Sequence, residues 1–110
     1  MLWDPSKDKP VEVIDEVGQL MLKTADYFET FEWCQEILVS DGAVCLLGGL
    51  IKVGNGDIKN DHLMSQPKIV QVAYRRITEH LDEEPVYWND DKERQKSEVI
   101  SMLREVAVLK

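Results

Sequence analysis

Two short polar segments of this chain contain the residue types that binding or catalysis would need. In residues 86–91, the aromatic pair Tyr87 and Trp88 runs directly into Asn89 and Asp90. In a structural interpretation, Trp88 fills space between helices, and Asn89 or Asp90 bonds loop backbone or the first-turn amides of the next helix. In a functional interpretation, Tyr87 and Trp88 form a recognition surface, and Asn89 and Asp90 present hydrogen-bonding groups to a ligand. The structural interpretation is the stronger one, and these four residues are the candidate binding site.

The second segment is the loop over residues 54–62, which is rich in glycine, asparagine and aspartate and contains Asp57, Asp61 and His62. A small enzyme or ligand-binding protein that uses this loop, or the turn at residues 88–90, is the alternative to a pure interaction role. The loop lacks the D-x-[DN]-x-[DN]-G spacing and the distal glutamate of a calcium site. His80, the other histidine, lies outside any zinc-ligand spacing. We therefore predict no metal site and no cofactor.

The sequence contains no motif of the common enzyme classes. No G-x-S-x-G turn exposes a serine nucleophile, and no glycine-rich phosphate loop is followed by Lys-Ser or Lys-Thr. The two cysteines, Cys34 and Cys45, have the spacing of neither a zinc site nor a redox motif, and no secretory leader is recognised. We expect them to be reduced packing residues of a cytoplasmic protein. No catalytic residue is assigned.

The chain is strongly acidic, with 21 Asp and Glu residues against 13 Lys and Arg residues and a formal net charge of -8. This charge repels phosphate backbones, so direct nucleic-acid binding is disfavoured. Its simplest interpretation is solubility. The sharper one is an acidic face that binds a basic partner, and its extreme form is a nucleic-acid mimic with carboxylates spaced like phosphates.

An almost uninterrupted apolar run over residues 43–53 predicts the core helix that positions both polar segments. The run is shorter than the ~20 residues needed to cross a bilayer, so no membrane span is expected. Its four large residues Leu46, Leu47, Leu50 and Ile51 should be almost fully buried. The adjacent glycines at positions 48 and 49 cost about 2 kcal/mol relative to alanines in a helix interior, so we expect a backbone or a bulky aromatic, such as Trp33 or Trp88, at close range.

Apolar residues that recur every three or four positions predict three further helices around this core. Residues 1–110 are therefore expected to form one compact all-α domain, a bundle of about four helices around the central helix. We predict a turn or short helix at residues 31–40, a loop at residues 86–92 and an extended arm at residues 1–10, with Asp41 as the N-cap of the core helix. The predicted helices span residues 11–29, 42–53, 66–81 and 95–108.

Several short motifs follow one another in a fixed order along the chain. They are Trp33 and Gln35 after the first helical segment, the Cys-Leu-Leu-Gly-Gly of residues 45–49 and the Trp-Asn-Asp turn of residues 88–90. This order resembles a family of small proteins from actinobacteria and their bacteriophages, whose function is unassigned, and the resemblance spans most of residues 13–107. Gly49 replaces the alanine of the family pattern, and Gln95 stands where a threonine caps the last helix. The resemblance implies a small helical cytoplasmic protein of phage origin and transfers no catalytic residue.

The sequence therefore favours a non-catalytic interaction protein. Its acidic surface and the region around Trp88 would bind a cellular protein, and a basic partner fits the charge of -8 best.

Overall fold

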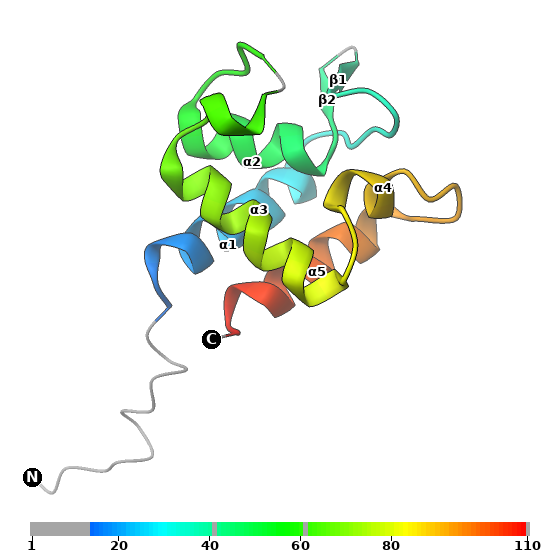
Figure 1. Ribbon diagram of the computed structural model, residues 1–110. Helices are drawn as coiled ribbons and strands as arrows, with labels where there is room; N and C mark the ends of the chain where they lie inside the picture. Colours follow the sequence, from blue (N-terminus) through cyan, green and yellow to red (C-terminus); the bar gives the residue numbers. More distant parts are fainter. Residues whose placement is uncertain (1–13, 41, 61, 110) are drawn as a thin grey trace, which may run out of the picture.

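The computed structural model describes residues 14–40, 42–60 and 62–109. The predicted all-α class is confirmed, since helices dominate this part of the chain and the sheet is a single small hairpin (Figure 1). The expected arm at residues 1–10 and the expected cap at Asp41 lie outside the described residues. In order, the elements are α1 (Glu16–Thr30), β1 (Val39–Ser40), β2 (Ala43–Val44), α2 (Leu46–Asn55), the 3₁₀ turn η3 (Leu63–Ser65), α3 (Lys68–Leu81), α4 (Pro85–Asn89) and α5 (Lys96–Ala107).

Helix α1 begins at Glu16, and the predicted start at residue 11 lies outside the described residues. Asp15 has an extended backbone, and its side chain accepts a hydrogen bond from the Gly18 amide at 2.8 Å. Asp15 is therefore the N-cap of α1. The predicted apolar stripe is confirmed along the rest of the helix, where the buried residues include Leu20, Met21, Ala25 and Phe28.

Helix α1 packs against α2, α3 and α5, and it therefore shares the central position that we predicted for α2 alone (Figure 1). The burial predicted for α2 is confirmed. Leu46, Leu50 and Ile51 are fully covered, and Leu47 is 7% exposed. The two helices together form the core on which α3, α4 and α5 rest.

Residues 43–44, which were predicted to open the core helix, instead form strand β2. Gly42, with φ of +87°, turns the chain so that Val44 pairs with Val39 in an antiparallel hairpin. The other edge of Val44 pairs with the segment around Trp33, because the Val44 amide donates to the Glu32 carbonyl at 3.2 Å. With hydrogen bonds on both edges the backbone stays extended, so α2 begins only at Leu46.

The predicted close approach at the two core glycines is confirmed, although neither tryptophan is the neighbour. A Cβ atom added to Gly48 would lie 2.7 Å from the backbone oxygen of Leu38, and one added to Gly49 would lie 2.6 Å from Cζ of Phe28. The glycines thus admit a loop backbone on one side of α2 and an aromatic ring of α1 on the other.

Residues 86–92, predicted to be a loop, contain the short helix α4, which Pro85 opens in the first turn. Residues 31–40, predicted to be a turn or a short helix, form no helix but an irregular segment with several bends that ends in β1. Helix α5 begins where predicted, and the Glu98 carboxylate accepts from the Gln95 amide at 2.8 Å.

Helix α4 and the β1–β2 hairpin lie at the same end of the bundle (Figure 1). Within the described ranges, no helix has the length and apolar composition needed to cross a bilayer.

Candidate functional site

Asn89, the centre of the predicted Trp-Asn-Asp turn, is fully buried. Its Oδ1 accepts hydrogen bonds from Nε1 of Trp33 at 2.6 Å and from the Leu46 amide at 3.1 Å. Its Nδ2 donates to the Cys34 carbonyl at 3.2 Å and to Oδ1 of Asp90 at 3.1 Å. An amide side chain can make four such bonds, so Asn89 is saturated. One side chain therefore joins α4, the segment after α1 and the first residue of α2.

A second layer of hydrogen bonds fastens the segment after α1 to the end of α4. Nε2 of Gln35 donates to the Asn89 carbonyl at 2.8 Å and to the Asp91 carbonyl at 2.6 Å. The Glu36 amide donates to Oδ1 of Asp90 at 2.8 Å. Glu36 has φ of +68°, a backbone conformation that non-glycine residues seldom adopt. The Asp90 carboxylate thus helps to hold a strained turn in place.

The two aromatic residues of the turn have different environments. Trp88 is half-buried, and the guanidinium carbon of Arg94 lies 3.8 Å from its ring centroid. Arg94 also donates to the Trp88 carbonyl at 2.9 Å and pairs with Glu98 at 3.3 Å. Tyr87, on the outer side of α4, is 71% exposed. Of the four predicted binding residues, Tyr87 is thus exposed, Trp88 and Asp90 are half-buried, and Asn89 is enclosed.

A groove lies between α4 and the segment that follows Glu36, directly above Asn89. We call it the α4 groove. Its accessible volume of ≈ 220 Å³ is smaller than a typical site for a drug-sized ligand. Among the described residues that line it there are two carboxylates and no basic side chain. The lining residues are Glu36, Ile37, Leu38, Cys45, Leu47, Val86, Asn89 and Asp90.

In the 54–62 loop, the alternative site, hydrogen bonds to backbone groups hold the chain in place, and the described functional side chains do not converge. Asp57 and His62 are exposed, and Asp61 lies outside the described residues. The His62 amide donates to Oδ1 of Asn60 at 2.9 Å, and the buried Gln66 donates to the carbonyls of Asn60 and His62. No group of three or more His, Cys, Asp or Glu residues in the described part of the chain is arranged to hold a metal ion.

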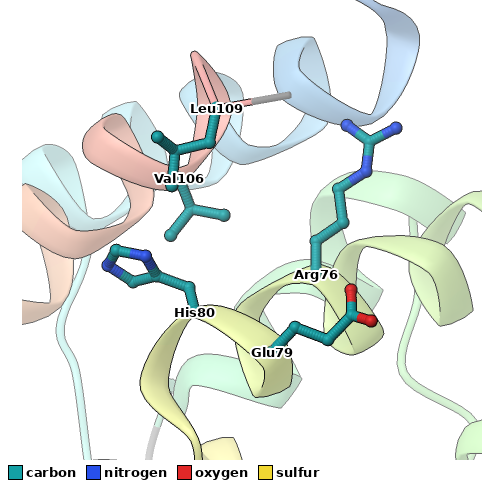
Figure 2. Close-up of a pocket in the computed structure, with 5 residues that line it drawn as sticks. All are labelled: Arg76, Glu79, His80, Val106 and Leu109. Atoms are coloured by element: carbon teal, nitrogen blue, oxygen red, sulfur yellow. The ribbon is translucent and has the colours of Figure 1, made fainter.

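A second hollow, with an accessible volume of ≈ 320 Å³, lies between α3 and the end of α5 (Figure 2). Two of its three polar side chains, Arg76 and His80, are paired with neighbouring carboxylates. Arg76 pairs with Asp15 at 2.6 Å, and Nε2 of His80 lies 3.4 Å from Oε2 of Glu105. Figure 2 shows the polar side chains rising from α3 and two aliphatic ones facing them. The hollow is lined by Arg76, Glu79, His80, Val106 and Leu109.

Two cysteine thiols beside the α4 groove and one tyrosine hydroxyl of the core have raised pKa values. Burial raises the pKa of the Cys45 thiol, and burial together with the nearby Cys45 raises the pKa of Cys34. Burial is also the main cause that raises the pKa of Tyr74, and the hydrogen bond from its hydroxyl to Oε2 of Glu84, at 2.7 Å, adds to it. None of these groups has the lowered pKa of an activated nucleophile.

Sequence reasoning found Asn89 and Asp90 but not the residues that meet them. Trp33 lies 56 positions from Asn89, and Gln35 lies 54 positions from it. Gln35 was noted only as part of a motif order, and Trp33 also as an expected neighbour of the core glycines. Nothing in their local spacing indicates a contact with Asn89 at that separation. Cys45 was expected to be a packing residue, whereas its sulfur also accepts from the Gly48 amide at 3.5 Å at the start of α2.

Residues 13–109 match the model of the family of unknown function DUF6197, and the chain belongs to that family. No curated protein and no solved structure matches the chain.

Proposed function

For this member of the DUF6197 family we propose a non-catalytic role in protein interaction, in which the α4 groove and its rim bind a basic, partly apolar segment of a partner protein. The observation that carries the proposal is the composition of the groove. Apolar walls from Ile37, Leu38 and Val86 lie beside the carboxylates of Glu36 and Asp90. A lysine or arginine flanked by an aliphatic residue would satisfy both features.

The surface beside the groove supports the same role. Tyr87 is 71% exposed and Ile37 is 55% exposed, and Val39 of β1 is exposed nearby in sequence. Large exposed apolar residues that adjoin a rigid groove are typical of recognition surfaces. The groove is rigid because the saturated Asn89 amide fixes both of its sides, so little conformational entropy is lost on binding.

The enzyme alternative has less support in the described residues. Asp57 and His62 face solvent, and the α4 groove contains a saturated amide and a neutral thiol instead of an acid–base pair. The nucleic-acid mimic also has less support, because α5 places basic side chains beside the acidic ones of α1. Arg104, for example, contacts both Asp26 and Glu29.

The proposal further places the protein in the cytoplasm, with an origin in an actinobacterial phage. The support for the location is the pair of free thiols, and the support for the origin is the motif order noted above.

Selection of displayed peptides on the immobilised protein tests the binding role. We expect the recovered peptides to combine Lys or Arg with aliphatic or aromatic residues. Ile37→Ser should weaken their Kd about tenfold, since it removes a groove wall. The matched control is Met64→Ser, which removes an exposed apolar side chain outside the groove. Recovery of acidic peptides, or equal weakening by the two substitutions, would refute the role of the groove.

A further inference from the structure

We propose that Cys34 and Cys45 form a reversible intramolecular disulfide in the folded protein, which makes this pair a thiol-oxidation site beside the α4 groove. Backbone register carries the inference. Trp33 and Val44 form a parallel bridge, in which the Val44 amide donates to the Glu32 carbonyl at 3.2 Å and the Cys34 amide donates to the Val44 carbonyl at 3.1 Å. The next residues in this parallel register are Cys34 and Cys45, which therefore stand opposite each other.

This register brings the two backbones within the range that a disulfide needs. Neighbouring strands lie about 4.8 Å apart, and disulfides join Cα atoms that are about 4.4 to 6.8 Å apart. The same side chain holds both partners, because Asn89 accepts from the amide that follows Cys45 and donates to the carbonyl of Cys34. The neighbouring Cys45, next to burial, raises the pKa of the Cys34 thiol, in keeping with this proximity. Both thiols are free, and Cys34 is the less buried of the two.

A small-molecule disulfide such as oxidised glutathione is the oxidant that the reaction needs. The Cys34 thiolate attacks one sulfur of that disulfide, forms a mixed disulfide and releases one small thiol. The Cys45 thiolate then attacks the Cys34 sulfur and releases the second small thiol. The protein loses two protons and two electrons, and the small disulfide gains them. Because burial raises the pKa of both thiols, the rate should rise by about tenfold per pH unit between pH 7 and 8, as the thiolate fraction does.

Disulfide formation changes the contacts that now shape the groove. The Cys45 sulfur would leave the Gly48 amide, and the Cys34 sulfur would leave the Ile37 carbonyl, which it now contacts at 3.2 Å. Ile37 is a wall of the α4 groove. Oxidation is therefore expected to alter partner binding, a consequence that rests on the proposed function, whereas the disulfide itself does not.

Mass spectrometry of the folded protein after equilibration with oxidised glutathione tests the proposal. We expect the chain to stay monomeric, to lose both titratable thiols and to become about 2 Da lighter, the mass of two hydrogens. Glu36 lies between the two cysteines, so cleavage after this residue separates them. The two resulting peptides should stay joined until a reductant is added.

Two variants serve as matched controls. Cys45→Ala should stop at one stable glutathione adduct on Cys34, whereas Cys34→Ser should form no internal disulfide. The mass of either variant can be read even if it folds poorly. Two glutathione adducts on the wild-type chain, a dimer linked between chains, or closure only in denaturant would each overturn the proposal.

A separate measurement tests the coupling to the groove. Selected peptides should bind the oxidised and reduced proteins with Kd values that differ by at least about threefold, and equal values would overturn the coupling. If the peptide selection itself recovers nothing basic, the proposed function fails. The mass measurement still decides whether the disulfide forms.

Discussion

Replacement of Asn89 by leucine, a side chain of similar size, should strongly lower the free energy of unfolding. The two side chains have similar size, so packing above α2 changes little, while all four hydrogen bonds of the amide are lost. The Leu46 amide, the Trp33 indole N–H and the Cys34 carbonyl would then have no partner at this position. Asp90 would lose a bond as well, but this residue is only half-buried.

The expected loss follows from these stranded groups. A buried polar group left without its partner costs about 1 to 3 kcal/mol. The Leu46 amide is deeply buried, whereas Trp33 and Cys34 are half-buried and can recruit some water. We therefore expect a loss of about 3 to 5 kcal/mol from a total stability of about 5 to 15 kcal/mol. In a domain of this size, that loss lowers Tm by about 12 to 25 °C.

Urea unfolding, followed by circular dichroism and by tryptophan fluorescence, measures this loss. The matched control is Asn55→Leu, an exposed asparagine whose side chain makes one local bond to the Asp57 carbonyl. Its effect should stay within about 0.5 kcal/mol. If Asn89→Leu costs less than about 1 kcal/mol, the hydrogen bonds around Asn89 contribute little, and the rigidity argued for the α4 groove is wrong.

Three further substitutions test other parts of the structure. Gly48→Ala and Gly48→Leu should both lower Tm, and leucine should lower it more, because even an added Cβ atom would lie 2.7 Å from the Leu38 oxygen. A rise in Tm for both variants would contradict this close approach. Leu50→Asp buries an unpaired charge at a fully covered position, so the variant should show no cooperative melt, and a wild-type melting curve would refute the placement of α2. Burial is the main reason that the pKa of Tyr74 is higher in the folded state than its unfolded value of about 10. The stabilisation linked to the neutral Tyr74 hydroxyl is therefore complete below pH 10, and it is lost as the pH rises above 10. Between pH 10 and 11, stability should therefore fall less steeply for Tyr74→Phe than for the wild type, by up to about 1.4 kcal/mol per pH unit, and identical slopes would refute the assignment.

The helices could be predicted wherever one face is apolar and the other polar. Helices α3 and α5 were located to within about two residues because their buried positions recur at helical spacing. The start of α2 could not be located, since residues 43 to 53 are apolar on every side and such a run fits a buried strand as well as a buried helix. Hydrogen bonds to a distant segment decide the outcome there, because the Glu32 and Cys34 backbones keep Val44 extended.

In the candidate site too, the residue types could be recognised from the local sequence, whereas their roles depend on contacts with residues far along the chain. The sequence identified residues 87 to 90 as polar and aromatic, but it left the structural and the binding interpretations as alternatives. In the structure, one five-residue helix accommodates both kinds of residue, with Asn89 fully enclosed and Tyr87 exposed. Asn89 is a structural residue because Trp33 and the start of α2 meet it, and these lie 56 and 43 positions away. By fixing α4, it also holds Tyr87 at the surface and the half-buried Asp90 at the α4 groove, where the proposed partner would bind.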